Sequence, residues 1–170
     1  MVVLAVSGAA MRVARAVEID LKRGSLDWVL ALGGSAGVTA PSVASFKFLN
    51  DVDIMMSPRL AICPSLDIGL WSDVVIVGTA VGVKFRFPSF YAEGADIGIR
   101  VQATFDYLRV ARETLFGVGV KVGPTFAWFA TEKIGAAITV ALRFGPIFAS
   151  GKSAAVGFWI DVGLGLVFVL

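Results

Sequence analysis

The sequence has no histidine and a single cysteine, and both features restrict the chemistry open to the chain. Histidine is the commonest general base and a frequent metal ligand, so its absence removes the usual means of both functions. With Cys63 alone, an internal disulfide and a cysteine-based metal site are excluded. Residues 33–37 (GGSAG) match the nucleophile motif G-x-S-x-G, but the histidine of the usual triad is missing. The sequence therefore predicts no enzyme, no metal site and no cofactor.

Charge is also scarce, at 16% of residues, whereas hydrophobic residues make up 57%. Soluble domains average about 25% charged residues. No stretch resembles a membrane-spanning helix, because the long uncharged segment 29–46 contains three glycines and Pro41. The Lys and Arg residues are scattered singly, which argues against a nucleic-acid partner. The hydrophobicity is thus high but dispersed along the chain.

The dispersed apolar residues alternate with small or polar ones, which is the period of a β-strand. The clearest case is 153–170, where every even position is apolar. Its length exceeds the roughly 9–11 residues that a tilted strand needs to cross a bilayer. The same alternation predicts strands over 25–39, 59–71, 75–87, 95–107, 116–128 and 134–148. Turns or loops are expected at 72–73, 88–94, 109–113, 131–133 and 150–152.

An eighth strand is expected from one of two segments, 13–22 or 42–49. Residues 40–57 read either as a long loop or as a short strand plus a turn, because 50–53 (NDVD) is a turn signal. Single-chain outer-membrane barrels have even strand numbers. The predicted fold is therefore all-β: a closed, up-and-down antiparallel transmembrane β-barrel of about eight strands, forming one domain over 17–170.

The N-terminal segment 1–16 has two interpretations. Residues 2–10 are an apolar run and 14–16 (ARA) resemble a signal-peptidase site, which together indicate a signal-peptide remnant. Alternatively, the apolar residues at 13, 17, 19 and 21 begin the first strand.

Each predicted strand has one apolar face and a second face of small or polar residues. The composition of this second face decides which side meets lipid. In the last three strands that face is mostly Gly, Ala, Ser and Thr, which suits the narrow interior of an eight-stranded barrel. Aromatic residues gather near strand ends, as in the girdles of membrane barrels. They are Trp28, Trp71, Phe85, Phe87, Phe90, Tyr91, Phe105, Tyr107, Phe126, Trp128 and Phe148. The alternative is a soluble lipocalin-like barrel, which would reverse the faces and carry an apolar ligand inside.

The polar residues of the second face are the candidate site, as an interior network or a pore lining. They are Asp67, Lys84, Arg86, Asp96, Arg100, Gln102, Thr104, Asp106, Lys121, Arg143 and Asp161, with Arg59, Thr125 and Thr139 beside them. Buried charges must be paired or hydrated. Ion pairs are expected between Arg100 or Arg143 and Asp106 or Asp161. Both a plug of salt bridges and a narrow polar path remain open.

The end of the chain resembles the assembly signal of outer-membrane proteins through Asp161, Gly163, Leu166 and Phe168, although the chain continues to Leu170. Residues 28–41 (WVLALGGSAGVTAP) are similar to the first strand of the OmpW family, and the whole pattern is also shared with OmpA-like and OmpX-like barrels. The resemblance implies a bacterial outer-membrane location, the lipid bilayer and the outer-membrane assembly machinery as partners, and a hydrophobic side pocket for small apolar solutes.

The expected function is accordingly that of an integral outer-membrane barrel with a structural, surface-contact or small-solute role. One feature departs from the usual pattern. With both chain ends on the periplasmic side, the short turns at 72–73, 109–113 and 150–152 face outward, whereas outer-membrane barrels normally place long loops there. Either one strand is miscounted near the N-terminus or the external loops are trimmed.

Overall fold

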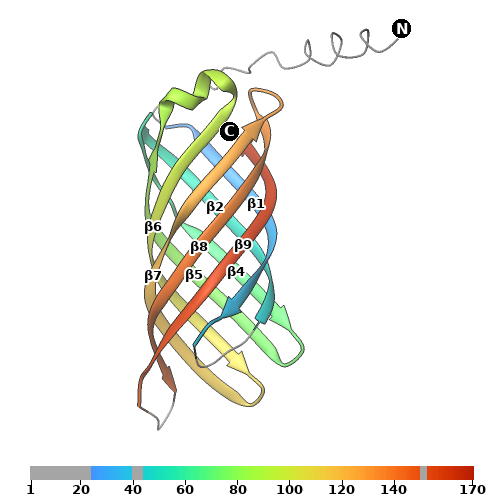
Figure 1. Cartoon of the computed structure of the whole chain (residues 1–170), viewed down its shortest axis with the longest axis vertical. Coiled ribbons are helices and arrows are strands. Elements are labelled where there is room, and N and C mark those ends of the chain that lie inside the picture. Colours follow the sequence, from blue (N-terminus) through green and yellow to red (C-terminus); the bar gives the residue numbers. More distant parts are fainter. Residues whose placement is uncertain (1–23, 40–43, 150–152) are drawn as a thin grey trace, which may run out of the picture.

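A computed structural model describes residues 24–39, 44–149 and 153–170 of the chain, and nearly all of them lie in one antiparallel sheet (Figure 1). The strands are β1 (Leu26–Gly37), β2 (Ala44–Ser57), β3 (Leu60–Ile62), β4 (Ser65–Trp71), β5 (Val74–Arg86), β6 (Ala95–Val110), β7 (Glu113–Phe129), β8 (Ile134–Ala149) and β9 (Ala155–Val169). A short 3-10 helix, η1 (Pro88–Glu93), precedes β6. No helix among the described residues is long and apolar enough to span a membrane.

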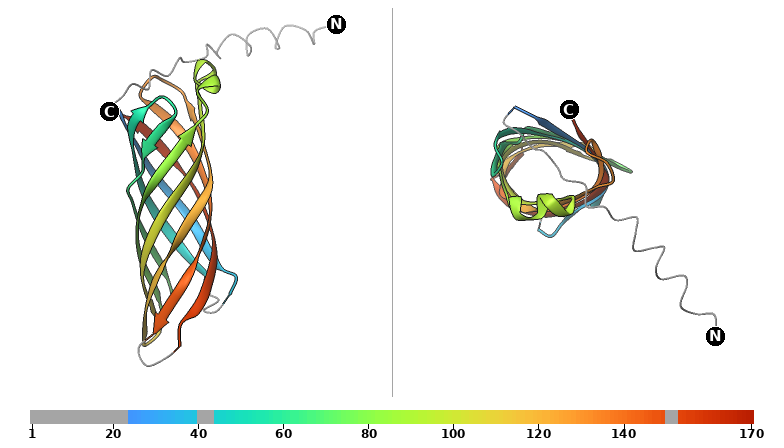
Figure 2. Two further views of the ribbon diagram at one scale, coloured as in Figure 1. Left: turned by 90° about the vertical axis from the view of Figure 1, so that its left-hand side faces the viewer. Right: turned by 90° about the horizontal axis from the view of Figure 1, so that it is seen from above.

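The sheet closes on itself because β1 pairs with both β2 and β9. β3 and β4 together fill one place in the ring, since both pair with β2 on one side and β5 on the other. The interruption between them lies at Cys63 and Pro64, where proline has no N–H to donate to the ladder. The nine strands therefore make a ring of eight. The view down the barrel shows that the ring is closed (Figure 2). The predicted fold class is confirmed.

Following paired residues once around the ring shows the stagger of the strands. The path leaves β1 at Leu26 and returns to it at Ala36, ten residues further along. It passes through Ile54, Ile62, Val83, Val101, Val122, Leu142 and Ile160. With a rise of about 3.3 Å per residue and strands about 4.8 Å apart, this stagger tilts the eight strands by about 40°. Each residue then advances about 2.5 Å along the barrel axis.

The region 40–57 differs from both of its predictions. From Ala44 to Ser57 it is one 14-residue strand, and the supposed turn at 50–53 lies in its middle. This strand is the extended form of the 42–49 candidate, so the ring needs no strand from 13–22. That segment, like 1–16, lies outside the described residues.

The two faces of the sheet are as unlike as the sequence predicts. Outward positions carry large exposed apolar side chains, such as Leu32, Val81 and Leu164. Inward positions carry buried charged residues from every part of the ring. The lipocalin-like alternative is therefore wrong, because the interior is charged rather than apolar.

The barrel has two rims that differ in their connections. The proximal rim holds the beginning of β1 at Leu26, the end of β9 at Val169, and η1 (Figures 1 and 2). The distal rim holds the opposite ends, including the tight connections at 72–73 and 111–112. Ser72 and Ala111 adopt left-handed backbone conformations there, with φ of 45° and 54°. The strand count of eight was right, and the two distal connections that are fully described, 72–73 and 111–112, are short.

Candidate functional site: the charged interior

All eleven residues of the predicted polar set are buried inside the barrel. Thr125 is buried with them and Thr139 is half-buried. Arg59 was misplaced: it lies in the connection between β2 and β3 and is exposed at the proximal rim. Four further charged residues are buried inside and were not predicted, namely Asp27, Lys47, Asp51 and Asp53. Three of these belong to β2, the strand that the sequence left unresolved.

Seven of these side chains form a cluster in the proximal half of the barrel. This proximal cluster consists of Asp27, Asp51, Asp53, Lys84, Arg86, Asp96 and Arg100. The Lys84 ammonium lies 2.9 Å from an oxygen of Asp53 and 2.7 Å from one of Asp96. Arg86 contacts Asp96 and lies 2.5 Å from Asp27, which ties β5 to β6 and β1. Four carboxylates here share three cations.

Arg100 completes the proximal cluster from β6. Its guanidinium contacts Asp51 and lies 2.8 Å from Asp53, both on β2. β2 and β6 are not neighbours in the sheet, so these ion pairs span the barrel interior. Of the two cations expected to pair with Asp106 or Asp161, Arg100 is therefore not the partner.

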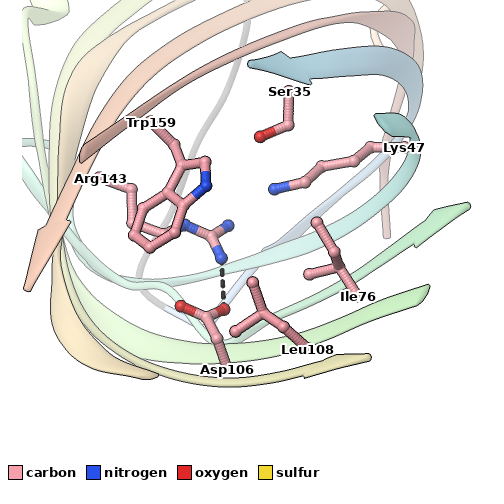
Figure 3. Close-up of a pocket in the computed structure, with 7 residues that line it drawn as sticks. All are labelled: Ser35, Lys47, Ile76, Asp106, Leu108, Arg143 and Trp159. Atoms are coloured by element: carbon pink, nitrogen blue, oxygen red, sulfur yellow. Dashed lines mark hydrogen bonds and ion pairs between the residues drawn. The ribbon is translucent and has the colours of Figure 1, made fainter. Parts of the chain in front are cut away.

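A second cluster fills the distal half. This distal cluster consists of Lys47, Asp67, Asp106, Lys121, Arg143 and Asp161. Its centre is Arg143, which contacts Asp106 (Figure 3). Arg143 also lies 2.6 Å from Asp67 and 3.1 Å from Asp161. The predicted pairs of Arg143 with Asp106 and Asp161 are therefore present. Three carboxylates balance three cations, since Lys47 also pairs with Asp161 at 2.8 Å and Lys121 with Asp67 at 3.1 Å.

Small inward residues make room for these long side chains. A Cβ atom on Gly78 would lie 2.5 Å from Asp106 Oδ1 and 3.1 Å from Arg143 Nη1. On Gly98 it would lie 3.0 Å from Cε of Lys84. An eight-stranded barrel has an interior that side chains just fill. The glycines of the second face therefore provide the space that the charged network occupies.

Apolar side chains close the interior beyond each cluster. Toward the distal rim a layer is formed by Val74, Ile76, Leu108, Leu115, Ile147 and Trp159. A second apolar group, on the proximal side, includes Met55, Ala61 and Phe129. In Figure 3 the ring of Trp159 and the side chains of Ile76 and Leu108 surround the Arg143–Asp106 pair. The ion pairs are thus shielded from water along much of their length.

The space left between these groups is small. Three interior cavities have volumes of about 10, 20 and 10 Å³. The 20 Å³ cavity is central, and Asp51, Arg100 and Gln102 all line it. Each of these three residues has a buried polar atom without a protein partner, Oδ1, Nε and Oε1 respectively. A cavity of this size with several polar partners suits about one water molecule.

The residues of the proposed assembly signal occupy the last strand, β9. Asp161 and Gly163 point inward, and Asp161 belongs to the distal cluster. Leu166 and Phe168 are on the outward face, where the Phe168 ring lies 6.2 Å from that of Trp28 on β1. The motif therefore lies on the strand that closes the ring, and its role in assembly remains a prediction.

The described part of the chain contains no group of Cys, Asp or Glu residues arranged to hold a metal ion. Every carboxylate of the two clusters faces a Lys or Arg side chain. The arrangement is one of mutual neutralisation inside a narrow tube. It offers strong cross-barrel contacts and very little open volume.

No protein family model and no curated protein sequence match the chain. Solved structures do match. The N-terminal β-barrel domain of Pseudomonas aeruginosa OprF is 14% identical, with a TM-score of 0.55 over 88% of this chain and 100% of that one. Neisserial surface protein A is 10% identical, with a TM-score of 0.60 over 85% of this chain and 96% of that one.

A third similar structure is Ail, the attachment invasion locus protein of Yersinia pestis. It is 13% identical, with a TM-score of 0.53 over 87% of this chain and 100% of that one. At such identities the likeness shows the fold. The resemblance to small outer-membrane barrels is confirmed at that level, and the specific likeness to OmpW remains a prediction: the chain has the fold of the eight-stranded β-barrel proteins of bacterial outer membranes.

Proposed function

We propose that the protein is an integral, non-enzymatic barrel of the bacterial outer membrane whose interior is closed to solutes. Its role is then structural or a matter of surface contact rather than conduction. The observation that carries this proposal is the filled interior, where two ion-pair clusters and apolar side chains leave cavities of about 10 to 20 Å³.

The outer surface supports the membrane location. A bilayer presents an apolar band of about 25 Å to a barrel, which a strand tilted by about 40° crosses in about 10 residues. Even β1, with 12 residues, is long enough. Exposed aromatic side chains lie toward both rims, with Trp28, Phe85 and Trp128 near the proximal rim and Phe116 and Phe148 near the distal rim. These positions match the two interfaces of a bilayer.

The proposal also supplies an orientation. With the beginning of β1 and the end of β9 at the periplasmic face, the short distal connections face the outside. The protein then presents little loop surface, which favours contacts made by its rims and its lipid-facing wall. Insertion by the outer-membrane assembly machinery, through the motif on β9, belongs to the same proposal.

The first test has two steps. The protein is extracted from the membrane fraction and run in SDS with and without boiling, because a closed barrel resists SDS until it is heated. Folded protein is then reconstituted in planar bilayers. A mobility shift without steady conductance supports a closed membrane barrel. Recovery in the soluble fraction without a shift contradicts the membrane location, and stable channels contradict the closed interior.

A second candidate function, binding of a small apolar molecule, is supported by a hollow on the lipid-facing wall. It measures about 270 Å³ and lies where β7 meets β8. Its lining is wholly apolar and comprises Ile99, Val122, Gly123, Pro124, Val140, Ala141 and Leu142. The ladder between β7 and β8 is interrupted here, because the paired residues pass from Val122–Leu142 directly to Thr125–Thr139. This hollow is our candidate for the side pocket that the OmpW resemblance implies.

Methyl NMR in nanodiscs tests the second candidate. Titration with a benzene-sized hydrocarbon should shift the methyl signals of Val122, Val140 and Leu142 more than those of Val81, which lies on β5 outside the hollow. A Val140→Phe variant, which fills the hollow, should abolish the local response. Equal shifts at all four residues would mean that the hydrocarbon merely dissolves in the lipid.

A further inference from the structure

Asn50 is a polar residue on the lipid-facing wall, at the middle of β2. Its paired neighbours are Leu30 on β1 and Leu66 on β4, and the adjacent outward residues on its own strand are Phe48 and Val52. All four neighbours are apolar. In hydrocarbon a carboxamide is costly unless its hydrogen bonds are made. The sequence therefore places a group that needs partners where lipid offers none.

Trp28 supplies one hydrogen bond, to the oxygen of the Asn50 carboxamide. Its indole Nε1–H donates a hydrogen bond of 2.7 Å to Asn50 Oδ1. Tryptophan near a membrane interface usually directs its N–H toward the polar side. Here it points to the middle of the wall instead. The amide N–H₂ of Asn50 has no hydrogen-bond partner among the described residues, and the carboxamide oxygen has a second lone pair.

The depth of Asn50 limits where the missing partner comes from. The outward series of β2 runs from Ala44 to Met56, and Asn50 is six residues from each end. Six residues correspond to about 15 Å along the barrel axis. Lipid carbonyls and headgroups lie at the edges of the apolar band, too far from Asn50 for a hydrogen bond. Water is excluded from the centre of the band. The partner must therefore be another protein group at the same depth.

A second copy of the chain supplies such a group. A two-fold axis along the membrane normal keeps both copies in the same orientation and brings equal depths together. Two Asn50 carboxamides that meet at the axis form a reciprocal pair, each donating one N–H to the free lone pair of the other Oδ1. The exposed side chains of Leu32, Phe48, Leu66 and Ile68 surround this point and supply apolar packing.

We infer that the protein forms a two-fold dimer in the membrane through the outer face of β1, β2 and β4, with the Asn50 pair at the axis. The inference rests on the membrane location proposed above. Trp28 acts in it as a positioning residue, since its bond to Oδ1 leaves the N–H₂ group directed to the partner. The partner is fixed by the self-complementarity of the carboxamide.

Thiol cross-linking in lipid vesicles tests the dimer. The starting variant is Cys63→Ala, which removes a cysteine that is fully buried. Val52→Cys then places a thiol one outward position from Asn50, and a bis-maleimide cross-linker, which spans a wider gap than a disulfide, should link two copies. The matched control is Val120→Cys on β7, on the opposite side of the ring, which should remain monomeric. Adding Asn50→Leu to Val52→Cys should weaken dimerisation about tenfold, because two interprotomer hydrogen bonds are lost.

Heat-dependent mobility in SDS is measured on the same samples and reports barrel folding without regard to pairing. Folded protein in which Val52→Cys cross-links no better than Val120→Cys overturns the dimer and leaves the proposed function intact. Cross-linking that is unchanged by Asn50→Leu also overturns the role of the carboxamide pair. Protein that does not insert or show heat-dependent mobility overturns the membrane location and the dimer together.

Discussion

Replacing Arg143 by methionine removes the cation at the centre of the distal cluster. Arg143 contacts Asp106, Asp67 and Asp161, and its side chain is about 5% exposed. Asp67 and Asp161 retain Lys121 and Lys47 as partners. Asp106 has no other ion pair among the described residues, so the variant leaves it as an uncompensated buried charge.

The expected loss follows from that orphaned carboxylate. Removing one partner of a buried ion pair destabilises a protein by about 3–5 kcal/mol. For a chain of this length each kcal/mol lowers the unfolding midpoint by about 2–4 °C, so a shift of about 10 °C is expected. The double variant Arg143→Met, Asp106→Asn restores charge balance and should recover about half of the loss. It does not recover all, because the new amide still lacks hydrogen-bond partners.

The assay is unfolding in lipid vesicles by urea and by heat, followed by the loss of the fast-migrating form in SDS. Arg112→Met, at an exposed position in the β6–β7 connection, is the matched control and should leave the midpoint unchanged. A single variant that loses less than about 1 kcal/mol would refute the closed, weakly hydrated interior. So would additive effects of the two substitutions, because coupled buried charges are not additive.

Three further predictions concern the wall and the turns. Leu164→Arg, on an outward position paired with Leu32 and Ile138, should destabilise the barrel in vesicles by about 2–4 kcal/mol; a loss below 1 kcal/mol would contradict its lipid contact. Pro64→Val should stabilise the barrel by about 1 kcal/mol in urea unfolding. The Val52 N–H already donates to the Pro64 carbonyl at 3.0 Å, and a valine N–H at position 64 can donate the second hydrogen bond of this residue pair, which proline cannot. Ala111→Gly should raise the midpoint slightly, by up to about 1 kcal/mol, because φ at this position is 54°; a decrease would show that the turn favours alanine there.

Strand alternation made most of the architecture predictable. From Arg59 onward the two faces differ so strongly in composition that the strands and their inward residues follow directly from the sequence. Pro64 lies within the predicted strand 59–71, and the structure has the ladder interrupted there. These predictions need only the local pattern, because the alternation within each strand shows which of its residues belong to which face.

The full length of the second strand was not recognised because of one residue. In 44–57 the alternation is regular apart from Asn50, a polar residue at an outward position beside Asp51 and Asp53. Asn50, Asp51 and Asp53 together resemble the sequence signal of a turn. Lys47, Asp51 and Asp53 were therefore not recognised as interior groups. The pairing of Arg100 with this strand was then unpredictable. Contacts such as Lys47 with Asp161 join residues 114 positions apart and depend on the stagger of the closed ring, which no local pattern encodes.

The pairing of β9 with β1 makes folding wait for the last residues of the chain. Until β9 is in place, Asp161 is absent from the distal cluster, and Lys47 and Arg143 each lack one carboxylate. An open sheet would also expose two unpaired edges to lipid, which is strongly unfavourable. Ring closure and completion of the distal cluster are therefore one event. A chain shortened by a single strand should be found as a chaperone-bound or degraded species rather than as a seven-stranded intermediate, because only the complete ring pairs both sheet edges and completes the distal cluster.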